Sequence, residues 1–150
     1  FNNTRDYEMA LSSFNKLINF RPELEKIDEY KELYAESLIQ LKRNDDAKKI
    51  LIELTTKSNS ISAYYQLGLI EFYKLNTDEA VKYWFEYLKR EKRKDRIVQA
   101  KFMIANAYES AERLKEAYNI YYSILGDYPN QDVIKKRLES IYQRRIARKR

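Results

Sequence analysis

Four alanines recur along the chain in register with large apolar residues, and this repeat limits the possible folds more than any other feature. Ala10, Ala47, Ala80 and Ala117 are separated by 37, 33 and 37 residues. A large side chain follows each alanine four and seven positions later: Phe14, Leu51, Trp84 and Tyr121, then Leu17, Leu54, Tyr87 and Ile124. A period of this length, kept along the chain, indicates an array of similar structural units.

The spacing inside each unit predicts two helices that pack closely together. An alanine and the large residues four and seven positions later lie on one face of a helix. Twelve residues before three of the alanines stands another small residue, Ala35, Gly68 or Ala105. Because small residues on both helices let the two backbones approach, we predict that each unit is a helix–turn–helix.

Capping residues and prolines predict where the helices begin and end. Asn44, Asn76 and Asn130 are the expected N-caps, while Pro22 and Pro129 follow helix ends because the residue before proline is pushed out of the α region. The basic run at residues 89–96 is interpreted as a solvated helix end and loop. The predicted helices span residues 5–20, 24–42, 45–57, 61–74, 77–93, 95–111, 114–126 and 131–148.

The composition argues against several classes of function. The chain has no Cys and no His, which removes disulfides, thiolate or imidazole catalysis, and the ordinary zinc and haem sites. Two glycines are too few for a glycine-rich phosphate loop, and with only two prolines the chain lacks the turns of an all-β protein. We therefore predict an all-helical protein that is not an enzyme, with no catalytic residue, cofactor or metal.

These residues give the chain a resemblance to the tetratricopeptide repeat (TPR) family, whose unit is a helix pair of about 34 residues. The closest stretch is AYYQLGLIEFYKLNTDEAVKYWFEYL, in which Tyr64, Leu67, Gly68, Ala80 and Trp84 take the positions of the family pattern. The next repeat matches less fully, with Lys101 where the family usually has Trp. The resemblance implies an all-α fold, a right-handed superhelical solenoid of TPR helix–turn–helix repeats with a C-terminal capping helix.

The expected organisation is a single array over residues 1–150. Residues 1–22 would supply the second helix of a partial repeat, and Phe1 falls where the missing first helix would carry its Tyr. Full repeats are predicted at 23–59, 60–94 and 95–129, followed by a capping helix with a basic tail at 130–150. A plain helix bundle remains as the alternative fold.

The resemblance also implies where a partner would bind, since the first helices of TPR repeats line a concave groove. Residues on these helices that point away from the small packing position form an aromatic and aliphatic surface with amides and an acidic end. We predict that they bind a segment or helix of another protein. The predicted protein-binding residues are Glu32, Glu36, Tyr65, Gln66, Leu69, Phe72, Phe102, Met103 and Asn106. The alternative for Phe72, Phe102 and Met103 is simple packing between repeats.

The positive charge of the chain is concentrated near its end. Eight of the 29 Lys and Arg residues lie in residues 135–150, beside a single acid, Glu139. The alternative function is therefore an electrostatic adaptor to nucleic acid or to an anionic membrane surface through this helix. Its apolar stripe, however, is better explained by capping the array. Nucleic acid is accordingly disfavoured as a partner, and the charges after residue 143 are expected to be mostly solvated.

The sequence leaves the cellular compartment open. No apolar run approaches the ~20 residues of a membrane span, so contact with a membrane would require an anchor outside this chain. The first residue is Phe and not Met, and an upstream targeting segment is compatible with this start. The richness in Lys, Ile, Asn and Tyr suggests a bacterial source, and then either the cytoplasm or the periplasm and cell envelope would suit the domain.

Overall fold

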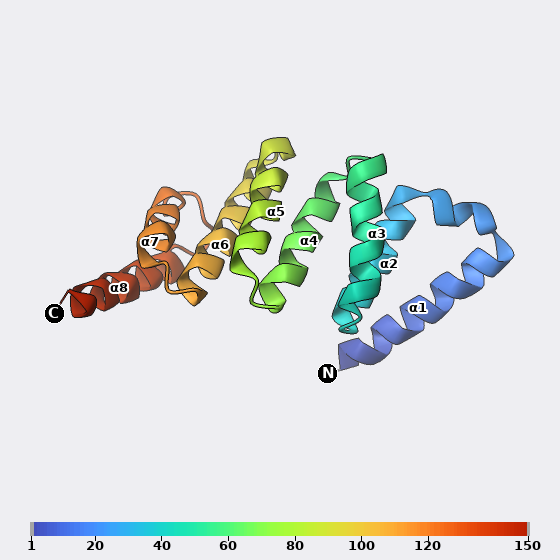
Figure 1. Ribbon diagram of the computed structural model, residues 1–150, viewed down its shortest axis with the longest axis horizontal. Helices are drawn as coiled ribbons and strands as arrows, with labels where there is room; N and C mark the ends of the chain where they lie inside the picture. The colour runs from blue at the N-terminus through green and yellow to red at the C-terminus, as the bar shows by residue number, and fades with distance from the viewer. Residues whose placement is uncertain (1, 150) are drawn as a thin grey trace. The chain divides into compact units, whose positions relative to one another are not determined.

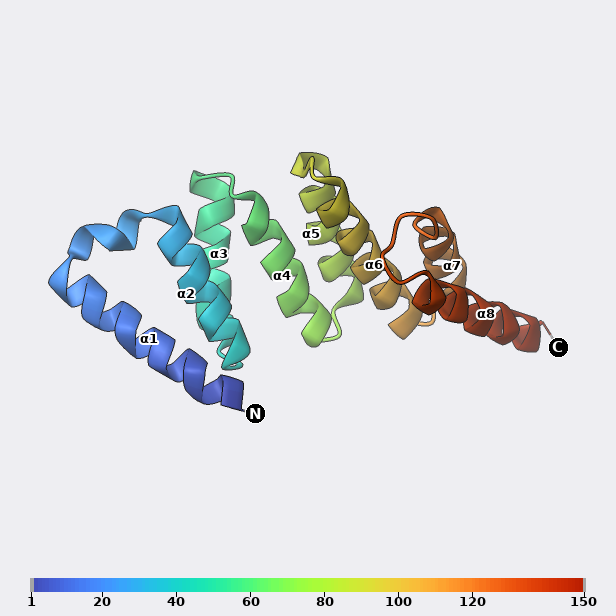
Figure 2. The ribbon, with the colours of Figure 1, turned by 180° about the vertical axis from the view of Figure 1, so that it is seen from behind.

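The computed structural model describes residues 2–149 as a succession of helices with short connections, and no strand occurs in this range (Figures 1 and 2). Phe1 and Arg150 lie outside the described residues, so the expectation for Phe1 is not addressed. The helices are α1 (Asn2–Phe20), α2 (Asp28–Gln40), α3 (Asn44–Lys57), α4 (Ile61–Tyr73), α5 (Thr77–Arg90), α6 (Lys94–Ser110), α7 (Leu114–Ser123) and α8 (Gln131–Arg148), with a 3₁₀ helix η1 (Pro22–Lys26) between α1 and α2. The predicted all-helical class is confirmed.

The chain divides into two compact units, residues 1–70 and residues 71–150, with the boundary inside α4. In the first unit, α2 packs against α3 around Leu38, Leu51 and Leu54, which are almost completely buried. In the second unit, α6 packs against α5 and α7, and α7 packs against α8. The core of the second unit is built around Trp84, Tyr121 and the apolar side of α8.

The small residues of the repeat occupy the packed positions that the sequence predicts for them. Ala47, Ala80 and Ala117 are fully buried, and so are Ala35 and Ala105 on the preceding helices. Any larger side chain there would have to displace packed neighbours. The helix–turn–helix register read from the alanine spacing is thereby confirmed.

Three equivalent turns connect α2 to α3, α4 to α5 and α6 to α7, and each contains a residue in the left-handed conformation. These residues are Lys42, Leu75 and Glu112, with φ of 64°, 64° and 61°. The next amide donates back across each helix end: Arg43 to Leu38 at 2.8 Å, Asn76 to Glu71 at 2.8 Å and Arg113 to Tyr108 at 2.9 Å. This is the Schellman arrangement, which satisfies carbonyls at the end of a helix and usually uses glycine.

Leu75→Gly is expected to raise the free energy of unfolding by about 0.5–1 kcal/mol, measured by chemical denaturation. A Cβ atom in the left-handed region costs about 1–2 kcal/mol, and glycine avoids this cost. Part of the resulting stabilisation is lost because glycine has greater conformational freedom in the unfolded chain. The leucine side chain is 82% exposed, so its removal sacrifices little packing. Leu75→Ala is the matched control, because it shortens the side chain but keeps Cβ. Equal stabilities of the Gly and Ala variants would contradict the prediction.

Two of the three predicted N-caps, Asn76 and Asn130, occupy the N-cap position, and only Asn130 caps its helix through its side chain. The side chain of Asn130 accepts a hydrogen bond from the amide of Val133 at 3.3 Å and caps α8. Asn76 stands at the N-cap of α5, but its side chain instead donates from Nδ2 to Glu71 Oε1 at 2.9 Å. Asn44 is already the first residue of α3, and Arg43 occupies the cap position. The physical reason at Asn44 and Asn76 is the Schellman turn that precedes α3 and α5. This turn already sets the backbone conformation at the start of each helix without a side-chain cap.

Four helix boundaries differ by three or more residues from those predicted, and two of them are the start of α1, at Asn2 and not at residue 5, and the end of α7, at Ser123 and not at residue 126. α2 begins at Asp28 and not near residue 24, because Pro22 opens a 3₁₀ turn that ends at Lys26. α5 ends at Arg90, where Glu91 adopts an extended conformation. α6 has 17 residues against 13 in α2 and α4, which accounts for the longer interval between Ala80 and Ala117.

The turn between α5 and α6 is organised by a buried carboxylate, which corrects the interpretation of residues 89–96 as merely solvated. Glu91 accepts hydrogen bonds from the amides of Lys92 and Arg93 at 3.0 Å, from the Arg93 guanidinium and, at 2.9 Å, from the Tyr87 hydroxyl. The Glu91 side chain is only 4% exposed. These donors, the Arg93 side chain first, hold the pKa of Glu91 well below its ordinary value. Burial and the bond to Glu91 raise the pKa of Tyr87 to about 12.

The search for membrane-spanning segments in the described residues gave a negative result. None of the helices between residues 2 and 149 combines the length and the apolar character needed to cross a bilayer.

Candidate functional site

The second unit contains a cavity of about 520 Å³ between α6 and α8, closed on one side by the end of α4. We call it the α6–α8 pocket. A volume of this size is typical of ligand-binding clefts. Its lining residues are Phe72, Asn106, Glu109, Ser110, Glu112, Arg137 and Arg144.

One wall of the α6–α8 pocket is held by the hydroxyl of Tyr121 on α7. This hydroxyl lies within hydrogen-bonding distance of Asn106 Oδ1 and, at 3.0 Å, of Glu109 Oε1. Burial, with the negative charge of Glu109 as a second cause, raises the pKa of Tyr121 above its ordinary value. The hydroxyl therefore stays protonated and donates, which fixes the side-chain positions of Asn106 and Glu109.

The other wall is a network of ion pairs between α6 and α8. Arg144 donates to Glu109 at 2.8 Å and also to Glu112. Arg137 lies 3.6 Å from Glu109, and Arg148 pairs with Glu112 at 3.3 Å. The expectation that charges after residue 143 are mostly solvated is wrong for Arg144, which is half-buried, whereas Arg148 is paired with Glu112 but exposed. Their partners lie one repeat length earlier, so α8 is joined to α6 by charge as well as by its apolar stripe.

Two groups in the α6–α8 pocket are available to a ligand, the ring of Phe72 and the amide Nδ2 of Asn106. The Phe72 ring is half-buried and packs against Trp84 with ring centroids 5.7 Å apart, so its position is fixed from behind. Asn106 Oδ1 faces the Tyr121 hydroxyl, while its Nδ2 donates to none of the described residues. The pocket thus combines an aromatic surface, one available amide donor and carboxylates already matched by guanidinium groups.

The structure brings together two of the predicted binding residues in the second unit and separates the other two from them. Phe72 and Asn106 line the α6–α8 pocket. Phe102 instead stacks on Tyr128 with centroids 4.6 Å apart and contacts the ring of Tyr121, at the edge of the core. Met103 is half-buried on α6. Whether Phe102 and Met103 bind a partner stays a prediction.

The predicted residues of the first unit do not form one cluster. Glu32 accepts a hydrogen bond from the Ser60 hydroxyl. Glu36 is exposed and lines a cavity of about 370 Å³ between α1 and α2. Tyr65, Gln66 and Leu69 are half-buried on α4.

A larger cavity of about 550 Å³ lies in the first unit, among α1, η1, α2 and α3. Lys31 and Glu53 pair across it at 3.1 Å, and the hydrogen bond from Lys31 lowers the pKa of Glu53. The Tyr30 hydroxyl donates to the carbonyl of Phe14, and burial raises the pKa of Tyr30. The Lys31–Glu53 pair and the Tyr30 hydroxyl are thus engaged within the first unit. The cavity that they line contains none of the predicted binding residues.

Sequence reasoning did not identify Glu112, Arg137 or Arg144 as parts of a site. A signal was present, because Arg137, Arg144 and Arg148 recur at spacings of seven and four and share one face of a helix. Glu109, near the end of α6, and Glu112, in the turn that follows it, likewise lie three residues apart. Among the residues that the structure describes, no group of three or more carboxylates could hold a metal ion.

Comparisons with known proteins agree with the repeat. A sequence profile of the tetratricopeptide repeat family matches residues 99–130, which include most of α6, all of α7 and the whole connection to α8. A search of curated proteins found no match.

Fourteen chains of known structure match the fold. One is the crystal structure of nearly identical TPR-like repeats of a protein described as a kinesin light chain from Podosopora anserina. It has a TM-score of 0.74 and 12% sequence identity, over 99% of the present chain and 84% of the other. At this identity the likeness concerns the fold, and it confirms the predicted TPR-like repeat fold with its C-terminal helix.

Proposed function

We propose that this chain, a tetratricopeptide-repeat protein, is a non-enzymatic scaffold that binds a segment of another protein in its α6–α8 pocket. Tetratricopeptide repeats generally mediate protein–protein interaction. The observation that carries the proposal is the juxtaposition of Phe72 and Asn106 in one cavity of suitable size. Both residues lie on the first helices of their repeats, where the family resemblance locates partner binding.

The lining of the α6–α8 pocket favours a short peptide segment as its occupant. An apolar side chain of the partner would pack on Phe72, whose ring is held by Trp84. Asn106 Nδ2 would donate to a backbone carbonyl, since its Oδ1 already accepts from Tyr121. The paired charges of Glu109 and Arg144 would supply a polar rim. The other predicted binding residues do not line this pocket, and binding of a partner by them stays a separate prediction: Glu32, Glu36, Tyr65, Gln66, Leu69, Phe102 and Met103.

The electrostatic adaptor is less favoured as a function of the C-terminal helix. Arg137 and Arg144 engage Glu109 of α6, and Arg148 engages Glu112 in the turn after α6, which reduces the charge available for phosphate. Binding driven by phosphate weakens steeply as salt increases, whereas binding by apolar contact does not. The two functions therefore differ in their response to ionic strength.

Asn106→Asp is expected to weaken binding of a pocket ligand by about tenfold or more. This substitution keeps the acceptor for Tyr121 but replaces the amide donor with a carboxylate. The probes are peptides selected from a random displayed library on the wild-type protein, with affinities measured by fluorescence anisotropy at two salt concentrations. Phe72→Ala should cause a similar loss through the apolar contact.

Ser140→Ala serves as the control, because Ser140 is an exposed residue of α8 that does not line the pocket. Its affinity for the selected peptides should remain within about twofold of the wild-type value. Circular dichroism verifies that each variant is folded. Selected peptides whose affinities respond to neither Asn106→Asp nor Phe72→Ala would refute binding in the α6–α8 pocket.

A further inference from the structure

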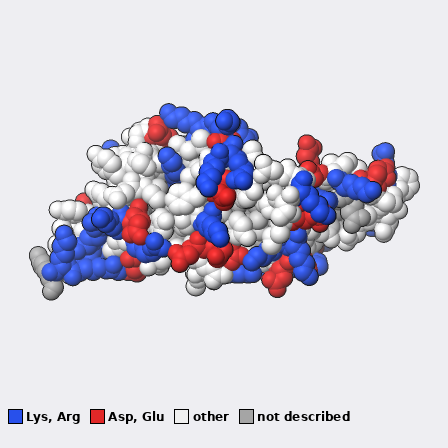
Figure 3. All heavy atoms as spheres, turned by 45° about the horizontal axis from the view of Figure 1, so that its top comes forward, with Lys and Arg blue, Asp and Glu red and all other residues white. Residues whose placement is uncertain are grey.

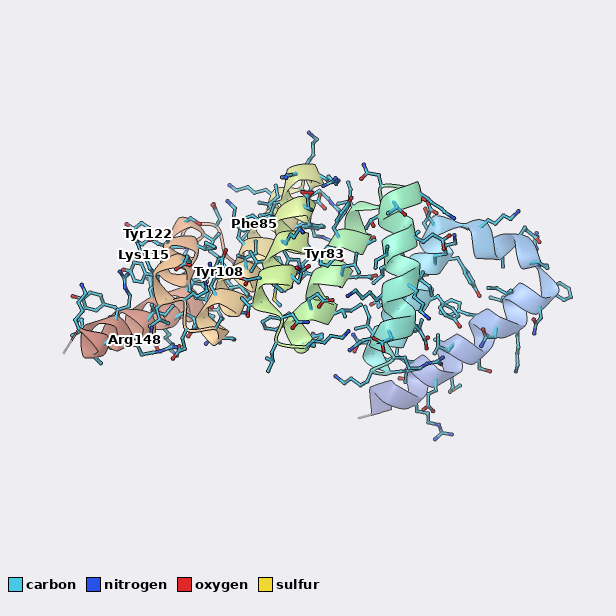
Figure 4. All side chains as sticks on the ribbon, viewed as in Figure 1. Tyr83, Phe85, Tyr108, Lys115, Tyr122 and Arg148 are labelled. Atoms are coloured by element: carbon cyan, nitrogen blue, oxygen red, sulfur yellow. The ribbon has the colours of Figure 1, made fainter. Side chains whose placement is uncertain are left out.

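A second surface of the second unit, formed by α7 and α8, carries exposed tyrosines among basic residues. On α7, Lys115, Tyr118 and Tyr122 share one face at spacings of three and four residues, and Lys115 and Tyr122 project together (Figure 4). The rings of Tyr118 and Tyr122 are nearly parallel, at 16°, with centroids 6.4 Å apart. Tyr122 is 64% exposed, more than packing within a repeat would require.

α8 extends this surface from the adjacent side. The guanidinium carbon of Arg145 lies 5.7 Å from the centroid of the Tyr118 ring and over it. Tyr142 and Lys149 lie one turn before and one turn after Arg145 and are both exposed. They occupy the flank of α8 opposite to Arg137 and Arg144, which face α6. We call this surface the α7–α8 face; it consists of Lys115, Tyr118, Tyr122, Tyr142, Arg145 and Lys149.

The α7–α8 face has positive charge without a matching acid. Lys115, Arg145 and Lys149 form no ion pair with the described residues, in contrast to Arg144 and Arg148 on the other flank. Of the nearest acids along the two helices, Glu116 is paired with Arg113, and Glu139, one turn before Tyr142, accepts from the neutral amide of Gln143 and keeps its charge. Basic side chains gather over α8 in the space-filling view (Figure 3). The three basic residues of the face outnumber this acid, and the face therefore favours an anionic partner.

We propose that the α7–α8 face binds an acidic segment of another protein, with carboxylates on Arg145 and Lys115 and apolar side chains on Tyr122 and Tyr142. Tyrosine and arginine are the residues that dominate the energetics of protein interfaces, because they combine a large rigid surface with directional hydrogen bonds. The cation over Tyr118 is already positioned, so less side-chain freedom is lost when a carboxylate binds it. This surface is separate from the α6–α8 pocket and the inference does not rest on the proposed function.

Two other anionic partners fit the α7–α8 face less well. Single-stranded nucleic acid binds to successive open aromatic faces, but the guanidinium of Arg145 lies over the Tyr118 ring. A bilayer surface is bound best by Trp, Phe or Leu side chains that insert beside the cations, and the aromatic residues of the α7–α8 face are all tyrosines. Ile134, Leu138 and Ile141 of α8 are buried in the core, and Val133 and Ile146 are half-buried. An acidic peptide needs neither feature.

The test compares three fluorescent probes: a peptide of alternating Glu and Phe or Leu residues, the same peptide with Gln for Glu, and an oligouridine. Binding of the acidic peptide should fall by about tenfold or more in the double variant Lys115→Glu, Arg145→Glu, and by about fivefold in Tyr122→Ser. The matched control Lys82→Glu, Lys136→Glu makes the same change in net charge at exposed positions on α5 and on another side of α8. It should change affinity by less than about twofold.

A charge-swapped peptide, with Lys for Glu, should bind the Lys115→Glu, Arg145→Glu variant more tightly than the wild type. This rescue separates recognition by the α7–α8 face from any loss of folding. The proposal is overturned if the control pair weakens binding as much as the test pair, or if the neutral peptide binds as well as the acidic one. It is equally overturned if oligouridine or vesicles containing phosphatidylserine bind through this face and the acidic peptide does not.

Discussion

Ile134→Ala is expected to lower the free energy of unfolding of the second unit by about 2–5 kcal/mol. Ile134 is completely buried in a cluster with Tyr121, Ile124 and Ile141. Truncation removes three carbons from this cluster and leaves a cavity, because α7 and α8 are also held by polar contacts and can collapse only partly. The transition can be followed by denaturant titration with the fluorescence of Trp84, which lies in the same unit.

The control for Ile134→Ala is Ser140→Ala, on the exposed side of the same helix. It should change the free energy of unfolding by no more than about 0.5 kcal/mol, because it removes no buried contact. If Ile134→Ala were equally mild, α8 would not be an integral part of the folded core. Its role as the capping element of the repeats would then have to be abandoned.

Glu91→Ala is expected to cost about 2–4 kcal/mol of unfolding free energy near neutral pH. The substitution leaves the amides of Lys92 and Arg93 and the buried Tyr87 hydroxyl without their acceptor. Hydrogen bonds to a charged group contribute more than neutral ones, and unsatisfied buried donors add a further penalty. The nearby Glu86→Ala provides a comparison, since Glu86 is half-buried and its closest pair, at 2.9 Å, is with the exposed Lys89, and pairs with exposed partners contribute little.

The contribution of Glu91 should depend on pH in a defined direction. Its pKa is lower in the folded chain than in the unfolded chain, so the unfolded state binds a proton first as the solution is acidified. The stabilisation is therefore complete above the ordinary glutamate pKa of about 4.3 and is lost progressively at lower pH. The difference in stability between the wild type and Glu91→Gln should shrink between about pH 6 and pH 3. A constant difference across this range would show that the Glu91 charge does not stabilise the fold.

Much of the fold was predictable because small residues recur at a regular spacing along the sequence. Ala47, Ala80 and Ala117 must be small wherever two helices touch, so their spacing reveals the packing without knowledge of the partners. The turns were less predictable, since Lys42, Leu75 and Glu112 adopt a conformation that sequence analysis associates with glycine. The carboxylate of Glu91 was missed for a related reason, because its burial depends on the backbone path after α5.

The candidate site was predictable only in part. Phe72 and Asn106 follow from helix periodicity, which assigns one face of each first helix to the solvent. The pairs of Glu109 and Glu112 with Arg144, and of Glu112 with Arg148, depend on the adjacency of α6 and α8, over 32 to 36 residues of chain. Phe102 illustrates the opposite difficulty, because periodicity cannot distinguish a groove residue from one that stacks on Tyr128 in a following loop.

The contact between Phe72 and Trp84 makes ligand binding directly observable by fluorescence. Trp84 is the single tryptophan of the chain and is completely shielded from water. One face of its environment is the Phe72 ring, which also lines the α6–α8 pocket. A peptide that displaces or immobilises this ring must alter the packing around the indole, and hence its emission intensity and lifetime. The native protein therefore contains an optical reporter for its own pocket, and peptides can be screened against it without any label.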